Sequence, residues 1–154
     1  MSVRIVPMTA EYAADIVTWR YRAPYDCYDM TGVDPEFLVD PVSGFHALVD
    51  DGGLIGFRSF GPDGRVPGGV YDSSALDTGG GLRPELTGCG LGREAISTGL
   101  AFGARQFAPP AFRMTIAAFN ARAQKVVRSL GFDAVGRFAA STNGRDYDIF
   151  TGAA

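Results

Sequence analysis

The feature that most constrains the fold of this chain is a cluster of glycines between residues 79 and 92. Three glycines in a row end the stretch that begins at Ala75, and three more alternate in Gly88-Cys89-Gly90-Leu91-Gly92. Apolar side chains then recur at helical spacing, at Ile96, Leu100, Ala104 and Phe107. A strand that enters a helix through glycines leaves backbone N–H groups unpaired at the positive end of the helix dipole. The sequence therefore predicts an anion site at this turn.

Composition restricts the class of protein around that turn. The chain has 154 residues, so we expect a single domain over 1–154, and a hydrophobic share of 46% is enough for a folded core. A net charge of −3 argues against binding to nucleic acid or an anionic membrane. Cys27 and Cys89 match neither a disulfide framework nor a metal site, so we expect no metal. With no signal segment and no long apolar run, a cytoplasmic location is expected.

The order of elements predicts an α/β (α+β) fold. Ahead of the glycines we expect a strand at Arg4–Pro7, a helix capped by Thr9 and running to Trp19, an irregular segment over 20–41, and a hairpin of Phe45–Asp50 with Leu54–Phe60. After the helix that ends near Phe107 we expect a strand at 112–118, a helix over 120–130 and a C-terminal hairpin around Asn143-Gly144. The result is a central mixed, mostly antiparallel sheet with one βαβ unit in its middle.

At two places the chain resembles the GNAT superfamily of N-acetyltransferases. The run from Leu82 to Gly92 is similar to that superfamily's acetyl-CoA motif, a strand end followed by Q/R-x-x-G-x-G/A and a helix. The run from Asn120 to Phe132 is similar to its second motif, in which an Asn opens a helix that ends in Leu-Gly-Phe. The resemblance implies a GNAT-like sheet in which the βαβ unit binds acetyl-CoA.

The resemblance also implies where acetyl-CoA, the only cosubstrate expected, would lie. The pyrophosphate would rest on the N–H groups of the turn, and the pantetheine arm would pair with the strand as an extra strand. Glycine permits both approaches because no Cβ intervenes. The cofactor-binding residues predicted in this way are Gly80, Gly81, Leu82, Arg83, Thr87, Gly88, Cys89, Gly90, Leu91, Gly92, Arg93 and Asn120.

Three positions depart from the family pattern. Glu85 and Thr87 stand where basic or amide side chains are common, so backbone donors must provide most of the pyrophosphate binding. Val127 stands seven residues after Asn120, where the family often has a tyrosine that acts as general acid. A non-catalytic acyl-CoA-binding module is therefore the alternative to an enzyme, and a regulatory interaction protein is a third reading.

The catalytic residue is predicted from chemistry, and the acceptor residues from chemistry within the segment that the resemblance places on the acceptor side. Asp77 is the best-placed carboxylate for a general base that deprotonates an acceptor ammonium, although an exposed strand-end Asp is the simpler interpretation. Cys89, at a helix N-terminus, is a weaker candidate for a covalent acyl-cysteine. Tyr25, Asp26, Tyr28 and Asp29 form an aromatic, acidic group that would suit a cationic amine, either a small molecule or a peptide. A homodimer is left open.

Overall fold

The computed structural model describes residues 2–154, which form one seven-stranded sheet in the order β1-β2-β3-β4-β5-β7-β6. The strands are β1 (Arg4–Pro7), β2 (Phe45–Asp50), β3 (Gly53–Phe60), β4 (Leu76–Leu82), β5 (Ala111–Ala117), β6 (Asp133–Ala139) and β7 (Asp146–Ala153). Neighbouring strands are antiparallel except β4 and β5, which are parallel. The expected mixed, mostly antiparallel sheet with one βαβ unit is confirmed.

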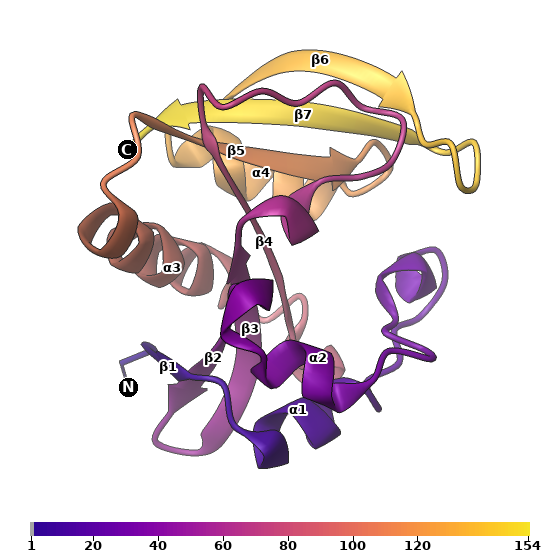
Figure 1. The fold of residues 1–154 in the computed structure, drawn as a ribbon. Helices are drawn as coiled ribbons and strands as arrows, with labels where there is room; N and C mark the ends of the chain where they lie inside the picture. The colour runs from indigo at the N-terminus through magenta and orange to yellow at the C-terminus, as the bar shows by residue number, and fades with distance from the viewer. Residues whose placement is uncertain (1) are drawn as a thin grey trace.

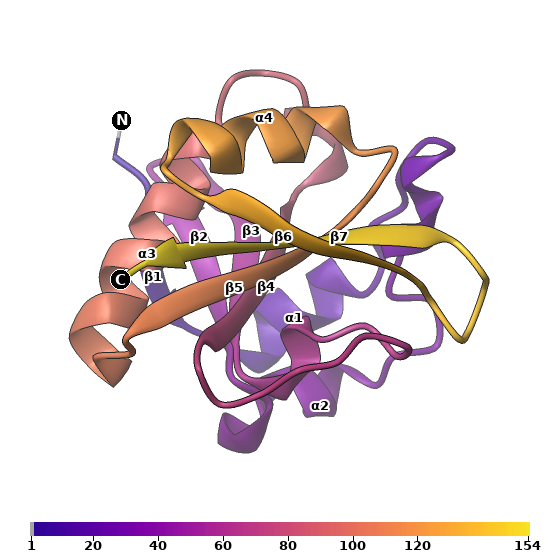
Figure 2. The same cartoon turned by 90° about the horizontal axis from the view of Figure 1, so that it is seen from above.

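Two pairs of helices cover opposite faces of the sheet. Helices α3 (Gly92–Phe107) and α4 (Ala121–Ser129) pack their apolar faces on one side, against a cluster of sheet residues that includes Phe60, Phe112 and Phe150. Helices α1 (Ala10–Ile16) and α2 (Pro35–Val39) lie on the other side, against Phe45 and Phe57. Figure 2 shows α4 on one side of the sheet and α1 and α2 on the other. We call the side with α1 and α2 the front, and the side with α3 and α4 the back.

Strands β4 and β5 separate soon after they meet. Only Leu76 pairs with Phe112 and Asp77 with Arg113, although β4 continues to Leu82 and β5 to Ala117. Figure 1 shows β4 turning away from β5 toward the lower half of the molecule. The sheet is therefore split beyond Asp77, and α3 begins just after the end of β4.

Most local expectations for the helices are met. The Thr9 side chain caps α1 by accepting the Tyr12 N–H at 3.1 Å, although α1 ends at Ile16 rather than at Trp19. The Asn120 side chain caps α4. Of residues 2–154, no helix is long and apolar enough to cross a bilayer.

The segment over 20–41 is more regular than expected. It contains α2 and two 3₁₀ turns, η1 (Tyr25–Tyr28) and η2 (Pro41–Ser43). Asp34 caps α2 and Pro35 occupies its first turn, a combination that signals a helix start in the sequence.

Candidate active site

The glycine turn presents free backbone donors. Gly88 and Gly90 have φ values of 73° and 83°, a left-handed conformation that favours glycine. Leu91 precedes the first turn of α3, and no side chain caps that turn. The exposed N–H groups at this helix end have no protein partner to satisfy them. A helix N-terminus therefore brings together the predicted residues Thr87, Gly88, Cys89, Gly90, Leu91, Gly92 and Arg93, and a Cβ at Gly90 would meet no atom within 4 Å.

One edge of β4 faces the split in the sheet. The backbone carbonyl of Asp77 accepts the Gly61 N–H, and the backbone N–H of Arg83 donates to the Ile55 carbonyl. The backbone groups of these two residues therefore point toward β3. Because successive residues of a strand direct their backbone groups to opposite edges, those of Thr78, Gly80 and Leu82 point toward β5. Beyond Asp77 no strand pairs with that edge among residues 2–154. An extended ligand can pair there, and Gly80 rather than Gly81 offers it backbone groups.

Arg83 and Leu82, both predicted to bind the cofactor, already contact other groups of the protein. The Arg83 guanidinium forms an ion pair with Asp15 at 2.6 Å and lies 5.0 Å from the Trp19 ring centroid, both on the front side. The Leu82 carbonyl accepts the hydroxyl of Tyr21 at 2.6 Å. These contacts argue against a phosphate contact from the Arg83 side chain and against ligand pairing at Leu82.

Glycine stands at positions 80 and 81 of β4 for a reason other than the expected close approach of a ligand. A Cβ at Gly80 would lie 2.8 Å from Cδ and Nη1 of Arg58. A Cβ at Gly81 would lie 3.2 Å from the Tyr21 hydroxyl and from a ring carbon of Phe57. A Cβ at Gly80 would also collide with the Phe57 backbone oxygen, so the missing side chains make room for the protein's own backbone and side chains, and not primarily for a ligand.

Asp77 is engaged in a buried ion-pair network. Its side chain is 2% exposed; one oxygen accepts Nε of Arg113 at 2.7 Å, and the other accepts Nη2 of Arg113 and Nε of Arg65, both at 2.8 Å. Both oxygens are thus bound to cations that cannot give up a proton near neutral pH. This arrangement argues against the predicted role of Asp77 as a base, and it also corrects the expectation of an exposed carboxylate.

The predicted acceptor residues line the front of the split. Tyr28 of η1 accepts the Asn120 side-chain N–H at 3.1 Å, and burial raises its pKa to about 12. Tyr25 packs edge-on against Phe119. With Tyr21 held at β4 and Tyr28 held at the start of α4, the segment between them crosses from one side of the split to the other. Asn120, which also caps α4, therefore positions this segment with its side chain.

The two acidic residues of the same segment differ in availability. Asp29 accepts the backbone N–H of Tyr21 at 2.9 Å and so stabilises the segment. Asp26 is exposed at the start of η1. Only Asp26 is free to attract a cationic acceptor from solution.

A basic residue that the sequence did not single out lies beside the turn. The Arg122 guanidinium lies 4.4 Å from the ring centroid of Tyr25, and a Cβ at Gly88 would approach its Nη1 to 3.0 Å. Arg93, in the first turn of α3, donates to the Ser129 hydroxyl at 2.9 Å. Position alone could have suggested Arg122, since it follows Asn120 by two residues in the second motif.

The remaining small groups near the turn have local roles. The Thr87 hydroxyl donates to the Pro84 carbonyl at 2.7 Å, and the exposed Cys89 thiol lies 3.6 Å from the Thr87 carbonyl. No base lies beside Cys89 in these contacts, so nothing here favours an acyl-cysteine. Among residues 2–154, no group of His, Cys, Asp and Glu side chains is arranged to hold a metal ion.

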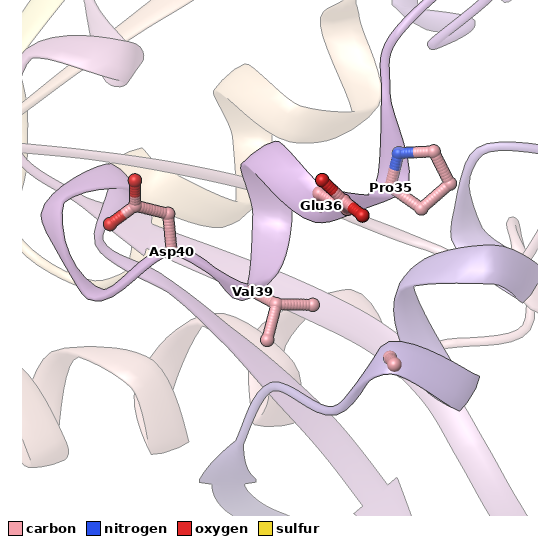
Figure 3. Close-up of a pocket in the computed structure, with 5 residues that line it drawn as sticks. Pro35, Glu36, Val39 and Asp40 are labelled. Atoms are coloured by element: carbon pink, nitrogen blue, oxygen red, sulfur yellow. The ribbon is translucent and has the colours of Figure 1, made fainter.

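Two hollows on the surface lie away from the glycine turn. One, of about 330 Å³, lies between α1 and α2 and is lined by Pro35, Glu36, Val39 and Asp40 (Figure 3). The other, of about 390 Å³, lies between the β3–β4 connection and the outer strands and includes Arg113 and Arg137. Neither includes a residue of the turn or of the free β4 edge.

Comparison with known proteins gives a fold but no close sequence relative. No family model and no curated protein matches the sequence. A spermidine N-acetyltransferase, a chimera of the Vibrio cholerae enzyme SpeG and hSSAT, superimposes with a TM-score of 0.76 at 14% identity, covering 99% of this chain and 96% of its own. A GNAT-family acetyltransferase from Bacillus anthracis gives a TM-score of 0.71 at 14% identity over 99% and 95%.

The chain has the GNAT fold. A further structure with this fold, the aminoglycoside acetyltransferase AAC(6')-Ib in complex with coenzyme A and kanamycin, gives a TM-score of 0.75 at 16% identity over 99% of this chain and 95% of that one. These similarities span nearly the whole of this chain and of each matched chain. At such identities they establish the fold, and the activity has to be inferred from the site.

Proposed function

We propose that the protein is an acetyl-CoA-dependent N-acetyltransferase that transfers an acetyl group to a primary amine of a small molecule or a peptide. The observation that carries the proposal is the uncapped N-terminus of α3, placed at the end of an unpaired β4 edge. An elongated ligand with an anionic group at one end and amide groups along its length matches both features. Solved proteins with this fold include acetyltransferases described as complexes with CoA.

In this proposal the pyrophosphate accepts N–H groups of the turn from Gly88 to Arg93, because the Thr87 N–H already donates to the Pro84 carbonyl at 3.3 Å. The pantetheine amides pair with the backbone of Thr78 and Gly80, which places the thioester near the point where β4 and β5 separate. Arg122 and Arg93 supply positive charge beside the turn in place of Arg83. Backbone donors supply most of the binding, as the lack of basic residues at 85 and 87 requires.

The acceptor approaches from the front, where the segment from Tyr21 to Tyr28 borders the split. Asp26 attracts a cationic amine, and the ring of Tyr25, which already packs against the Arg122 guanidinium and Phe119, adds apolar surface beside it. Relatives by fold include enzymes named for spermidine and for aminoglycosides, both polyamines, which is consistent with an acidic entrance.

Chemistry proceeds by direct attack in a ternary complex. The neutral amine nitrogen bonds to the thioester carbonyl carbon, the C–S bond breaks, and its electron pair remains on sulfur, giving the amide, CoA thiolate and one proton for solvent. Val127 is fully buried in the back core, so it leaves the role of the family's tyrosine unfilled. With Asp77 bound to two arginines, no side-chain base is assigned.

The experiment is release of free CoA thiol from acetyl-CoA with a panel of polyamines, aminoglycosides and short peptides, with the acetylated product identified by mass. We expect acceptor-dependent thiol release with at least one cationic amine. The matched control is Gly90→Asp, which should bind no CoA and release none. Tight acetyl-CoA binding without turnover for every acceptor would instead favour the non-catalytic binding module.

A further inference from the structure

Arg58 on β3 places a positive charge behind the split in the sheet. Its Nη2 donates to the Thr78 hydroxyl at 3.0 Å and lies 3.8 Å from the Met114 sulfur. Thr78 and Met114 are the first residues of β4 and β5 beyond their last pair. The guanidinium therefore bridges the two strands at the point where they separate, on the side covered by α3.

This charge has no anionic partner. Arg58 is 5% exposed, its Nε has no hydrogen-bond partner, and no carboxylate of residues 2–154 forms an ion pair with it. Burial lowers its pKa to about 10, so it remains charged at neutral pH. A buried charge without a counter-charge costs folding free energy, and the hydrogen bond to the neutral Thr78 hydroxyl offsets only part of that cost.

The chain reserves space for this side chain on two elements. A Cβ at Gly99 of α3 would meet Arg58 first, at 2.9 Å from Cγ, whereas a Cβ at Gly80 of β4 would collide with the Phe57 backbone oxygen and would also lie 2.8 Å from Nη1 of Arg58. Glycine in a strand and inside a helix is itself unfavourable, because it loses more backbone freedom on folding than other residues. Gly99 and a buried charge are thus retained in one place beside Gly80, at the end of the free β4 edge where the proposed thioester would lie.

We propose that Arg58 is a catalytic residue that stabilises the negative charge appearing on the thioester during acyl transfer, and on the CoA thiolate in particular. The inference rests on the proposed function and adds to it, since it assigns an electrostatic role where Val127 removes the acid. Arg58 transfers no proton. As the C–S bond breaks, its guanidinium stays charged and the sulfur keeps the electron pair.

The surroundings make the thiolate the group that such a charge would affect. From β4, β5 and α3 the guanidinium meets Thr78, Gly80, Met114 and Gly99, none of which titrates. Asp77 and Arg113 point to the opposite face and pair with each other. In front of the split, Tyr21 and Tyr28 both have pKa values raised by burial, that of Tyr28 to about 12.

The test measures whether bound CoA ionises more readily than free CoA. Affinities of CoA and of desulfo-CoA are determined by calorimetry between about pH 6 and pH 9 for the wild type, Arg58→Met and Arg58→Lys. Desulfo-CoA has the same phosphates, so the ratio of the two affinities isolates the thiol. A free alkyl thiol has a pKa of about 8.5, and a nearby cation lowers it.

For the wild type, the preference for CoA over desulfo-CoA should increase about tenfold across this range, with most of the increase below pH 8.5. Arg58→Met should reduce that increase to less than about twofold, and Arg58→Lys should keep much of it. A ratio that is independent of pH in the wild type overturns the role of Arg58 while the proposed function stands. Failure of both ligands to bind overturns the proposed function together with this inference.

Two further readouts separate catalysis from structure. Arg58→Met should unfold at the same temperature as the wild type or higher, because it removes an uncompensated buried charge. With an accepted amine, its kcat should fall about a hundredfold with little change in the KM for acetyl-CoA. A large loss of stability without loss of kcat would identify Arg58 as structural and contradict the proposal.

Discussion

At the scale of single residues, buried charge distinguishes structural from functional side chains in this protein. Asp77 and Arg113 lie opposite each other at the last pair of β4 and β5, and their bidentate contact holds the strands together just before they separate. The guanidinium of Arg58 lies on the other face, at Thr78 and Met114, and has no such partner. Removal of the paired charge should therefore harm folding, whereas removal of the unpaired one should harm function.

We predict that Asp77→Asn lowers the free energy of unfolding by about 3–5 kcal/mol, because it leaves Arg113 without its buried counter-charge. Chemical denaturation checks this value. Asp72→Asn is the matched control, since Asp72 contacts the same arginine with a side chain that is 73% exposed, and its loss should be much smaller. Equal losses for the two variants would contradict the assignment of Asp77 as the structural partner.

The Asp15–Arg83 pair gives a pH dependence with a definite sign. The hydrogen bond from Arg83, with a smaller one from Trp19, lowers the pKa of Asp15 below its ordinary value of 3.8. A carboxyl group with a depressed pKa stabilises the fold above about pH 4 and loses that contribution as the pH falls through its folded pKa. Melting temperatures of the wild type and Asp15→Asn should differ at pH 6 and converge toward pH 2. A constant difference would refute the coupling.

At the scale of elements, the turn before α3 depends on backbone conformation and on charge, and two variants separate these. Asn tolerates the left-handed conformation of Gly90 better than most residues, and a Cβ there meets no neighbour. Gly90→Asn and Gly90→Asp have the same shape and differ in charge. We predict that Gly90→Asp binds CoA at least about tenfold more weakly than Gly90→Asn by calorimetry. Equal affinities would mean that the turn is only structural.

Sequence patterns predicted elements better than they predicted contacts. The βαβ unit, the cap at Thr9 and the helix after Gly92 follow from local patterns, the helix start at Asn120 follows from the family resemblance, and all of them are present. The reasons for Gly80 and Gly81 could not be read locally, because Arg58 and Tyr21 reach them from other parts of the chain. The same holds for Arg83 and Asp77, because their partners, Asp15 of α1 and Arg113 of β5, are distant in the sequence.

At the scale of the whole molecule, ligand binding should appear as added stability. If CoA binds only the folded state, CoA at a hundredfold excess over its Kd adds about 2.7 kcal/mol, which raises the melting temperature of a chain of this length by roughly 5–10 °C. A thermal scan with CoA, with adenosine alone as the control, measures the shift. An absent shift would favour the interaction protein over both CoA-dependent alternatives.

The most direct measurement is a crystal structure of the complex with acetyl-CoA. We predict the pyrophosphate within hydrogen-bond distance of the N–H groups of residues 88–93, the pantetheine paired with Thr78 and Gly80, and the thioester in front of the Arg58 guanidinium. Acetyl-CoA bound elsewhere, in the hollow beside Arg137 or between α1 and α2, would contradict the account.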